Sequence, residues 1–137
     1  MIKYDNKYYN EVIKKYNYDK INPFIDISDE TFSNKWICSY NLNDFVNGLE
    51  KKEKCIVIMG IGINGIPHIG TVSQILKAIY LQKKGFFVQI ILGDLDVYGA
   101  RSTPLREINK LLKKYENFII SLGFDINKGR IRNQYEH

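Results

Sequence analysis

The 137-residue sequence is poor in cysteine, histidine and proline, and it has no long apolar run. Its two cysteines, Cys38 and Cys55, lie 17 positions apart with no Cys-x-x-Cys pair and no histidine nearby, which argues against structural zinc and for a reduced protein. Residues 1–20 lack the apolar segment of a signal peptide, and no run approaches the roughly 20 apolar residues that span a bilayer. We therefore expect a cytoplasmic protein with no metal site of its own and no membrane partner.

The net charge is positive, +5 at pH 7, and the sequence pI is about 9.1. Clustered lysines attract nucleic-acid phosphates. Here, however, the lysine pairs 51–52, 83–84 and 113–114 fall where helix ends and exposed helix faces are expected. Lys, Asn, Ile and Tyr are all frequent and can all be encoded by A/T-rich codons, so genome composition accounts for much of the positive charge. The charge by itself therefore predicts solvated helix faces rather than a nucleic-acid interface.

Residues 55–137 follow an alternating pattern of strands and helices. Apolar runs predict strands at 55–59 and 86–92, with a third strand near 130–133, and helical periodicity predicts helices over 71–84 and 104–122. Residues 93–103 are expected to form a loop. This β-α-β-α-β order predicts an α/β fold with a parallel sheet and right-handed crossovers.

Residues 1–54 have a less regular pattern. A short amphipathic helix is expected over 8–16, a short strand at 36–40 and a helix over 41–54, joined by an irregular segment. We expect residues 1–54 to be an N-terminal extension packed on the core, and residues 55–137 to be a Rossmann-like nucleotide-binding unit.

The segment 60–71, GIGINGIPHIGT, directly follows the first of these strands. In open α/β sheets ligands bind at the carboxyl ends of strands, where glycines let a ligand approach the backbone and a helix N-terminus offers amide groups to phosphate. The segment contains G-x-G-x-x-G at 60–65, but the loop runs on to Pro67 and His68, unlike a dinucleotide fingerprint, and no Gly-Lys-Ser/Thr of a Walker loop follows. The residues that we expect to bind the nucleotide are Gly60, Ile61, Gly62, Gly65, His68, Gly70 and Thr71.

The tetrapeptide at 68–71, His-Ile-Gly-Thr, resembles the HIGH signature of class I aminoacyl-tRNA synthetases. The spacing of Gly60, Gly65 and His68 is similar to that of the tryptophanyl and tyrosyl branch, as are the segments LQKKGFFVQIILGDLDVYGAR and LGFDINKGRIRNQYEH. The resemblance covers about residues 55–137. It implies the first half of the Rossmann-like (HUP-type) parallel sheet of this class, with flanking helices.

The resemblance also implies an activity, which is ATP-dependent activation of an amino acid to an aminoacyl-adenylate, with Mg²⁺ accompanying ATP and tRNA as a possible acceptor. His68 would then stabilise the charge that develops on the α-phosphate. Thr71 stands where the signature usually has a second histidine, and its hydroxyl donates a hydrogen bond but carries no positive charge. The competing interpretations are a surface or cap histidine for His68 and an ordinary helix-start glycine for Gly70.

Asp94, Asp96 and Tyr98 follow the second predicted strand and are the candidates for binding the amino acid. A carboxylate there could bind the substrate ammonium or hold a neighbouring loop; the competing explanation is an Asx turn, more so for Asp96 than for Asp94, and Tyr98 could simply pack. Arg101 could meet phosphate or tRNA, or be a solvated arginine.

Several features of the branch are missing from this sequence. Ile63 and Asn64 replace its usual proline and serine or threonine, and the lysine-rich KMSKS loop is not found, since 127–132, NKGRIR, is no adequate copy. These departures keep two alternatives open, a non-catalytic synthetase-like nucleotide-binding or regulatory module and a small nucleotidyltransferase with an H-x-G-H signature. They also suggest a fragment or truncated homologue whose first strand lies at an unpaired edge, so we expect a homodimer or a complementary chain.

Overall fold

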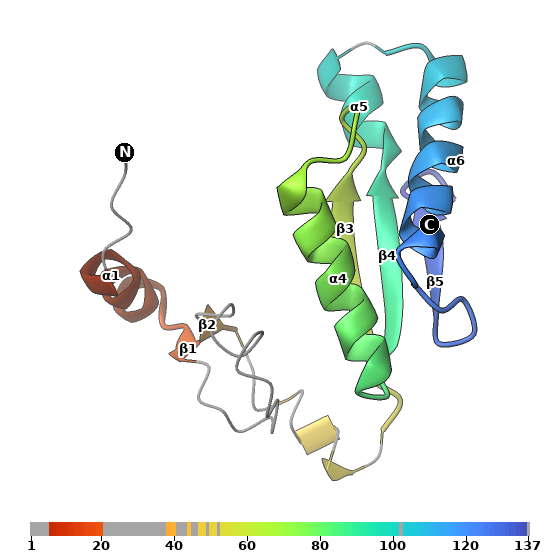
Figure 1. The fold of residues 1–137 in the computed structure, drawn as a ribbon. Coiled ribbons are helices and arrows are strands. Elements are labelled where there is room, and N and C mark those ends of the chain that lie inside the picture. The colour runs from red at the N-terminus through yellow and green to blue at the C-terminus, as the bar shows by residue number, and fades with distance from the viewer. Residues whose placement is uncertain are drawn as a thin grey trace. The chain divides into compact units, whose positions relative to one another are not determined.

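The structure is a computed structural model that describes residues 6–20, 38–40, 44, 47–48, 50–51, 53–101 and 103–136. The chain divides into two compact units, Met1–Cys55 and Ile56–His137 (Figure 1). The N-terminal unit contains helix α1 (Asn6–Tyr16) and two short antiparallel strands, β1 (Asp19–Lys20) and β2 (Cys38–Ser39). β2 lies within the strand expected at 36–40, and seven of the 14 residues of the helix expected over 41–54 lie outside the described residues. The packing of residues 1–54 on the core stays a prediction.

The second unit is an α/β structure with three parallel strands. Its elements are, in chain order, β3 (Ile56–Gly62), α4 (Ile69–Lys83), β4 (Phe87–Gly93), α5 (Asp94–Arg101), α6 (Leu105–Ser121) and β5 (Gly129–Asn133). The sheet has the order β3-β4-β5 and both pairings are parallel. The predicted Rossmann-like α/β class is therefore confirmed. The prediction of a loop over 93–103 was wrong, because helix α5 begins directly at the end of β4.

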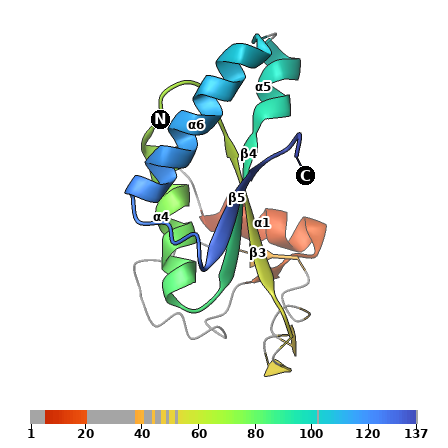
Figure 2. The same ribbon diagram turned by 90° about the vertical axis from the view of Figure 1, so that its right-hand side faces the viewer.

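The two long helices lie on the same side of the sheet (Figure 2). Both crossovers step in one direction along the sheet, and right-handed crossovers in one direction place their helices on one face. The core forms between that face and the helices. Its fully or nearly fully buried members include Ile75 and Ile79 of α4, Val88, Ile90 and Leu92 of β4, and Ile108 and Ile119 of α6.

Glycines end both long helices with backbone angles that other residues rarely adopt. Gly85 follows α4 with φ of 95° and Gly123 follows α6 with φ of 105°. The chain thus turns sharply after each helix and enters β4 or β5 within a few residues.

Gln82 connects the end of α4 to the turn that precedes β5. Its side chain is 2% exposed, its Nε2 donates to the Asp125 carbonyl at 2.8 Å, and its Oε1 accepts from the Asp125 backbone N–H at 2.9 Å. This pair of hydrogen bonds satisfies both backbone groups of Asp125 and sets the position at which β5 begins.

The described residues include no helix that is both long enough and apolar enough to cross a membrane.

Candidate functional site

A cavity of about 330 Å³ lies where β3 ends and α4 begins. This volume falls within the range of about 300–1,000 Å³ that is typical of small-molecule sites. Three of the seven residues that line it, His68, Gly70 and Thr71, belong to the tetrapeptide at 68–71. The full set of lining residues is Gly62, Asn64, His68, Gly70, Thr71, Gln74 and Tyr115.

His68 is the N-cap residue of α4. Its backbone is extended, and its Nδ1 accepts a hydrogen bond from the Gly70 N–H at 3.1 Å. Because Nδ1 acts as the acceptor, the neutral imidazole carries its proton on Nε2. The side chain is exposed, so this Nε2–H group is available as a donor to an oxyanion.

Gly70 has a steric role that explains its spacing from the histidine. A Cβ atom at this position would lie 2.9 Å from Cε1 and 3.1 Å from Nδ1 of His68. Any larger residue would push the imidazole away from the helix start and disturb the cap. Glycine two positions after the histidine is therefore needed to place the ring, in addition to the room it leaves for a ligand.

Two of the residues that line the cavity are nearly buried and carry hydroxyl groups. Thr71 is 6% exposed and lies in the first turn of α4, and Tyr115 is 2% exposed and comes from α6. Burial raises the pKa of the Tyr115 phenol above its usual value of 10.0, so the hydroxyl is protonated at neutral pH.

Three lining residues were missed by sequence reasoning, namely Asn64, Gln74 and Tyr115. Asn64 lies within the glycine-rich loop, and Gln74 lies three residues after Thr71, so helical spacing places it on the same face of α4. Both signals were present in the sequence. Tyr115 gave none, because its position within a helical apolar stripe is also that of an ordinary core residue.

The other predicted nucleotide-binding residues do not line this cavity. Ile61 is 2% exposed and belongs to the core, while Gly65 adopts φ of 79° in the loop between β3 and α4. Gly60 is an exposed position on β3 with open space where a Cβ would lie. These three residues shape the strand end and the loop around the cavity.

Asp94 and Asp96 are in the first turn of α5 and both contact Gln134, the residue after β5. The Gln134 N–H donates to Asp94 Oδ1 at 2.8 Å, and its side-chain Oε1 accepts from the N–H groups of Leu95 and Asp96 at 3.1 and 3.2 Å. Asp94 is only 6% exposed. Gln134 thus caps α5 and connects it to the end of β5.

Asp96 lies close to the end of β3. A Cβ at Gly93 would come within 3.0 Å of Asp96 Oδ2, 3.6 Å of the Ile61 carbonyl and 3.7 Å of Gly62 Cα. Gly93 therefore leaves open the space that the Asp96 carboxylate and the end of β3 both border. Tyr98 is 52% exposed, and the side chain of Arg101 lies outside the described residues.

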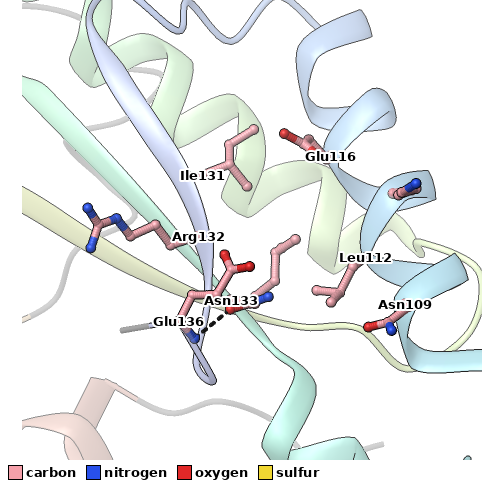
Figure 3. Close-up of a pocket in the computed structure, with 9 residues that line it drawn as sticks. Asn109, Leu112, Glu116, Ile131, Arg132, Asn133 and Glu136 are labelled. Atoms are coloured by element: carbon pink, nitrogen blue, oxygen red, sulfur yellow. Dashed lines mark hydrogen bonds between the residues drawn. The ribbon is translucent and has the colours of Figure 1, made fainter. Parts of the chain in front are cut away.

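A second cavity, of about 370 Å³, lies between α6 and β5 (Figure 3). Leu92, Leu112 and Ile131 line its apolar part, and the Glu136 N–H donates to Asn133 Oδ1 at 2.8 Å at one end. None of the predicted site residues lines it.

No group of three or more His, Cys, Asp or Glu residues that could hold a metal ion occurs in the part of the chain that the structure describes. The first cavity, which we call the cavity below His68, is lined by imidazole, hydroxyl and amide groups that can donate hydrogen bonds, and its lining contains no carboxylate. Such a lining suits the phosphates of a nucleotide, and a magnesium ion would have to enter bound to those phosphates.

Comparison with known proteins gives a consistent family. Residues 50–137 match the family model described as tRNA synthetases class I (W and Y). The tyrosine–tRNA ligase of Methanopyrus kandleri is 35% identical over 80 residues, which are 58% of this chain and 25% of that protein. The tryptophan–tRNA ligase of Thermoplasma volcanium is 28% identical over 117 residues, covering 79% of this chain and 28% of that protein.

Solved structures of the same kind share the fold. The tryptophanyl-tRNA synthetase of Aeropyrum pernix superimposes with a TM-score of 0.82 at 18% identity, covering 96% of this chain and 38% of that one. The tryptophanyl-tRNA synthetase of Plasmodium falciparum superimposes with a TM-score of 0.79 at 23% identity, covering 98% of this chain and 39% of that one. The chain thus spans about a quarter of the length of the curated relatives it matches. On the strength of the family match over residues 50–137, this chain belongs to the class I tRNA synthetases of the tryptophanyl and tyrosyl group.

Proposed function

We propose that this chain supplies the ATP-binding half of a class I synthetase and takes part in activating an amino acid to its aminoacyl-adenylate. One observation carries the proposal, which is the His68 imidazole held at the start of α4 by Gly70, at the mouth of a cavity lined by neutral donors. Family membership supports an aminoacylation-type function.

In this proposal the nucleotide phosphates lie at the start of α4, where the helix dipole and free backbone N–H groups favour an anion. The His68 Nε2–H donates to the α-phosphate as the carboxylate of the amino acid attacks and pyrophosphate leaves. Thr71 adds a second, uncharged donor. Magnesium accompanies ATP and neutralises its phosphates.

The amino-acid side of the site is proposed to include Asp96 and Tyr98, with Asp94 holding their helix to β5. Asp96 is the exposed carboxylate of the two and lies beside the end of β3, so it has the better access to a substrate ammonium group. We propose cytoplasmic ATP and an amino acid as the substrates, with tRNA as acceptor in an assembly that includes a second copy or a complementary chain.

ATP–pyrophosphate exchange with each of the twenty amino acids tests this function. Exchange that depends on one amino acid would establish adenylation and identify the substrate. In His68→Ala we expect the exchange rate to fall by about 100-fold to 1,000-fold, the usual effect of removing one donor to a developing oxyanion.

Because His68 also caps α4, a cap-preserving variant is the matched control. Asparagine is a good N-cap residue, so His68→Asn should keep the thermal stability of the wild type and still lose exchange. Full exchange in His68→Asn would show that the imidazole does not act in the reaction.

A second candidate function is a nucleotide-binding module without catalysis. Thr71 favours it, because the residue in this position cannot carry the positive charge of the signature's usual histidine. This alternative predicts calorimetric binding of ATP by the wild type together with no exchange for any of the twenty amino acids.

A further inference from the structure

Tyr115 is the one residue from α6 that lines the cavity below His68. It shares that cavity with His68 and Thr71, although it lies far from both in the sequence. Its side chain is 2% exposed, so nearly all of the tyrosine is enclosed by protein on every side except the cavity. Through Tyr115, helix α6 contributes to the same cavity as the glycine-rich segment 60–71 and the start of α4.

The Tyr115 hydroxyl has no hydrogen-bond partner among the described residues, although the residue as a whole is nearly buried. No described residue forms a hydrogen bond with it, and its oxygen is not among the fully enclosed ones. Buried tyrosine hydroxyls usually find a hydrogen-bond partner. Because Tyr115 lines the cavity and its oxygen keeps some accessible surface, a ligand in the cavity can supply this partner.

The chemistry of the cavity indicates what that partner is. Besides Tyr115, the lining offers the imidazole of His68, the hydroxyl of Thr71 and the amides of Asn64 and Gln74, with no carboxylate among them. Burial raises the pKa of the Tyr115 phenol, so at neutral pH the hydroxyl is a donor. A lining that offers donors and contains no carboxylate fits an anionic acceptor.

We propose that the Tyr115 hydroxyl donates a hydrogen bond to a phosphate oxygen of the bound nucleotide, so that α6 forms part of the phosphate site. This inference rests on the proposed function, since it requires that the nucleotide bind in this cavity. It assigns a direct binding contact to a residue outside the 60–71 segment.

Calorimetric titration with ATP, AMP and adenosine on the full 137-residue chain tests the contact. A hydrogen bond to a charged acceptor corresponds to about a tenfold to hundredfold change in affinity. We expect Tyr115→Phe to weaken the binding of ATP and AMP by that factor, and to keep the affinity for adenosine within twofold of the wild-type value. Tyr80→Phe is the matched control, because Tyr80 is 8% exposed, lies on α4 and does not line the cavity, and its affinity for ATP should stay within twofold.

Equal affinity for ATP in Tyr115→Phe and the wild type overturns the inference and leaves the proposed function standing. A folded wild type that binds none of the three ligands overturns the proposed function, and the inference with it. Equal weakening of adenosine and ATP also overturns the inference, because it places the contact outside the phosphates.

A second measurement needs no substitution that could affect folding. The pKa of Tyr115 in the wild type can be followed by NMR of tyrosine labelled at the ring carbon that bears the hydroxyl. A phosphate accepting this proton disfavours the phenolate, so ATP should raise the pKa further and adenosine should not. An ATP-saturated protein with an unchanged Tyr115 pKa would contradict the contact.

Discussion

At the scale of single residues, Gly129 is the glycine in the sheet at which an added side chain would meet the closest contacts. It is the buried first residue of β5, and a Cβ there would overlap the Val88 carbonyl and come within 2.8 Å of Phe124 Cζ. A backbone oxygen in the middle of a sheet cannot move aside. We therefore expect Gly129→Ala to lower the free energy of unfolding by about 3 kcal/mol, at the upper end of overpacking effects, as measured by urea denaturation.

Gly99→Ala is the matched control for that prediction. Gly99 lies within α5 and has open space where a Cβ would be built. Alanine in a helix is favoured over glycine by about 1 kcal/mol, so this variant should be neutral or slightly more stable. Equal losses in the two variants would mean that the crowding at Gly129 does not limit stability.

Residues with local signals were predictable, and those placed by tertiary structure were not. His68 and Gly70 could be assigned because a histidine, a glycine and a helix start occur together in four residues. Tyr115 reaches the same cavity only through the packing of α6, which no spacing in the sequence records. Asp94 and Asp96 were recognised as candidates, but their common partner Gln134 lies about 40 positions away.

At the scale of elements, the link between α4 and the start of β5 depends on Gln82. Gln82→Met keeps the size of the side chain but leaves the Asp125 N–H without a partner, whereas the Asp125 carbonyl still accepts from the Lys128 N–H at 3.1 Å. An unpaired group costs about 1–3 kcal/mol when it is shielded from water, and Asp125 is half-buried, so we expect a loss of about 1–2 kcal/mol in the free energy of unfolding.

Lys110→Ala provides the comparison for Gln82→Met. It breaks the 2.9 Å ion pair with Glu107, in which both side chains are more than half exposed. Exposed pairs of this kind contribute less than about 1 kcal/mol. A loss in Gln82→Met no larger than that in Lys110→Ala would refute the role of Gln82.

The helix α5 depends on Gln134 for its N-terminal cap. Gln134→Ala removes the oxygen that accepts from the N–H groups of Leu95 and Asp96. These two amides should then exchange with solvent at least tenfold faster in hydrogen-exchange NMR, because the first amides of a helix have no partner within it. Amides in the middle of α6 should exchange as in the wild type, and unchanged exchange at Leu95 and Asp96 would exclude capping by Gln134.

The same helix marks the limit of reading elements from the sequence. Strands and long helices were correctly predicted because their apolar periodicity extends over enough residues to be distinctive. The segment Asp94–Arg101 is only eight residues long and begins with two aspartates, a composition that suits a turn as well as a helix start. The hydrogen bonds that Gln134 Oε1 accepts from the Leu95 and Asp96 N–H groups favour the helix, and Gln134 follows β5 in the chain, far from this segment.

At the scale of the whole molecule, the open edge of the sheet is the feature that we expect to control association. No described strand pairs with the free side of β3, and Ile56 and Ile58 on this strand are 46% and 58% exposed. Open, apolar strand edges pair with other chains, and lysine on an edge strand opposes such pairing. We expect the wild type to associate at high concentration in sedimentation velocity and Ile58→Lys to shift it toward the monomer.

The control for the edge prediction places the same substitution elsewhere. Ile120 on α6 is 42% exposed, so Ile120→Lys adds the same charge at a helix surface. It should sediment as the wild type does. A wild type that remains monomeric at high concentration, or an equal effect of both lysines, would rule out the β3 edge as the contact.

The strand order also has a consequence for synthesis on the ribosome. Within Ile56–His137, β4 is added beside β3 and β5 beside β4, so the sheet grows in a single direction as the chain emerges. Domains fold from the N-terminal side during translation. β3, which leads into the glycine-rich segment 60–71, is therefore the first strand of this unit to appear and gains no neighbour on its free side as β4 and β5 form. A nascent-chain experiment should find the β3 edge accessible to chaperones throughout the translation of this unit, and its shielding should coincide with the arrival of a partner rather than with completion of β5.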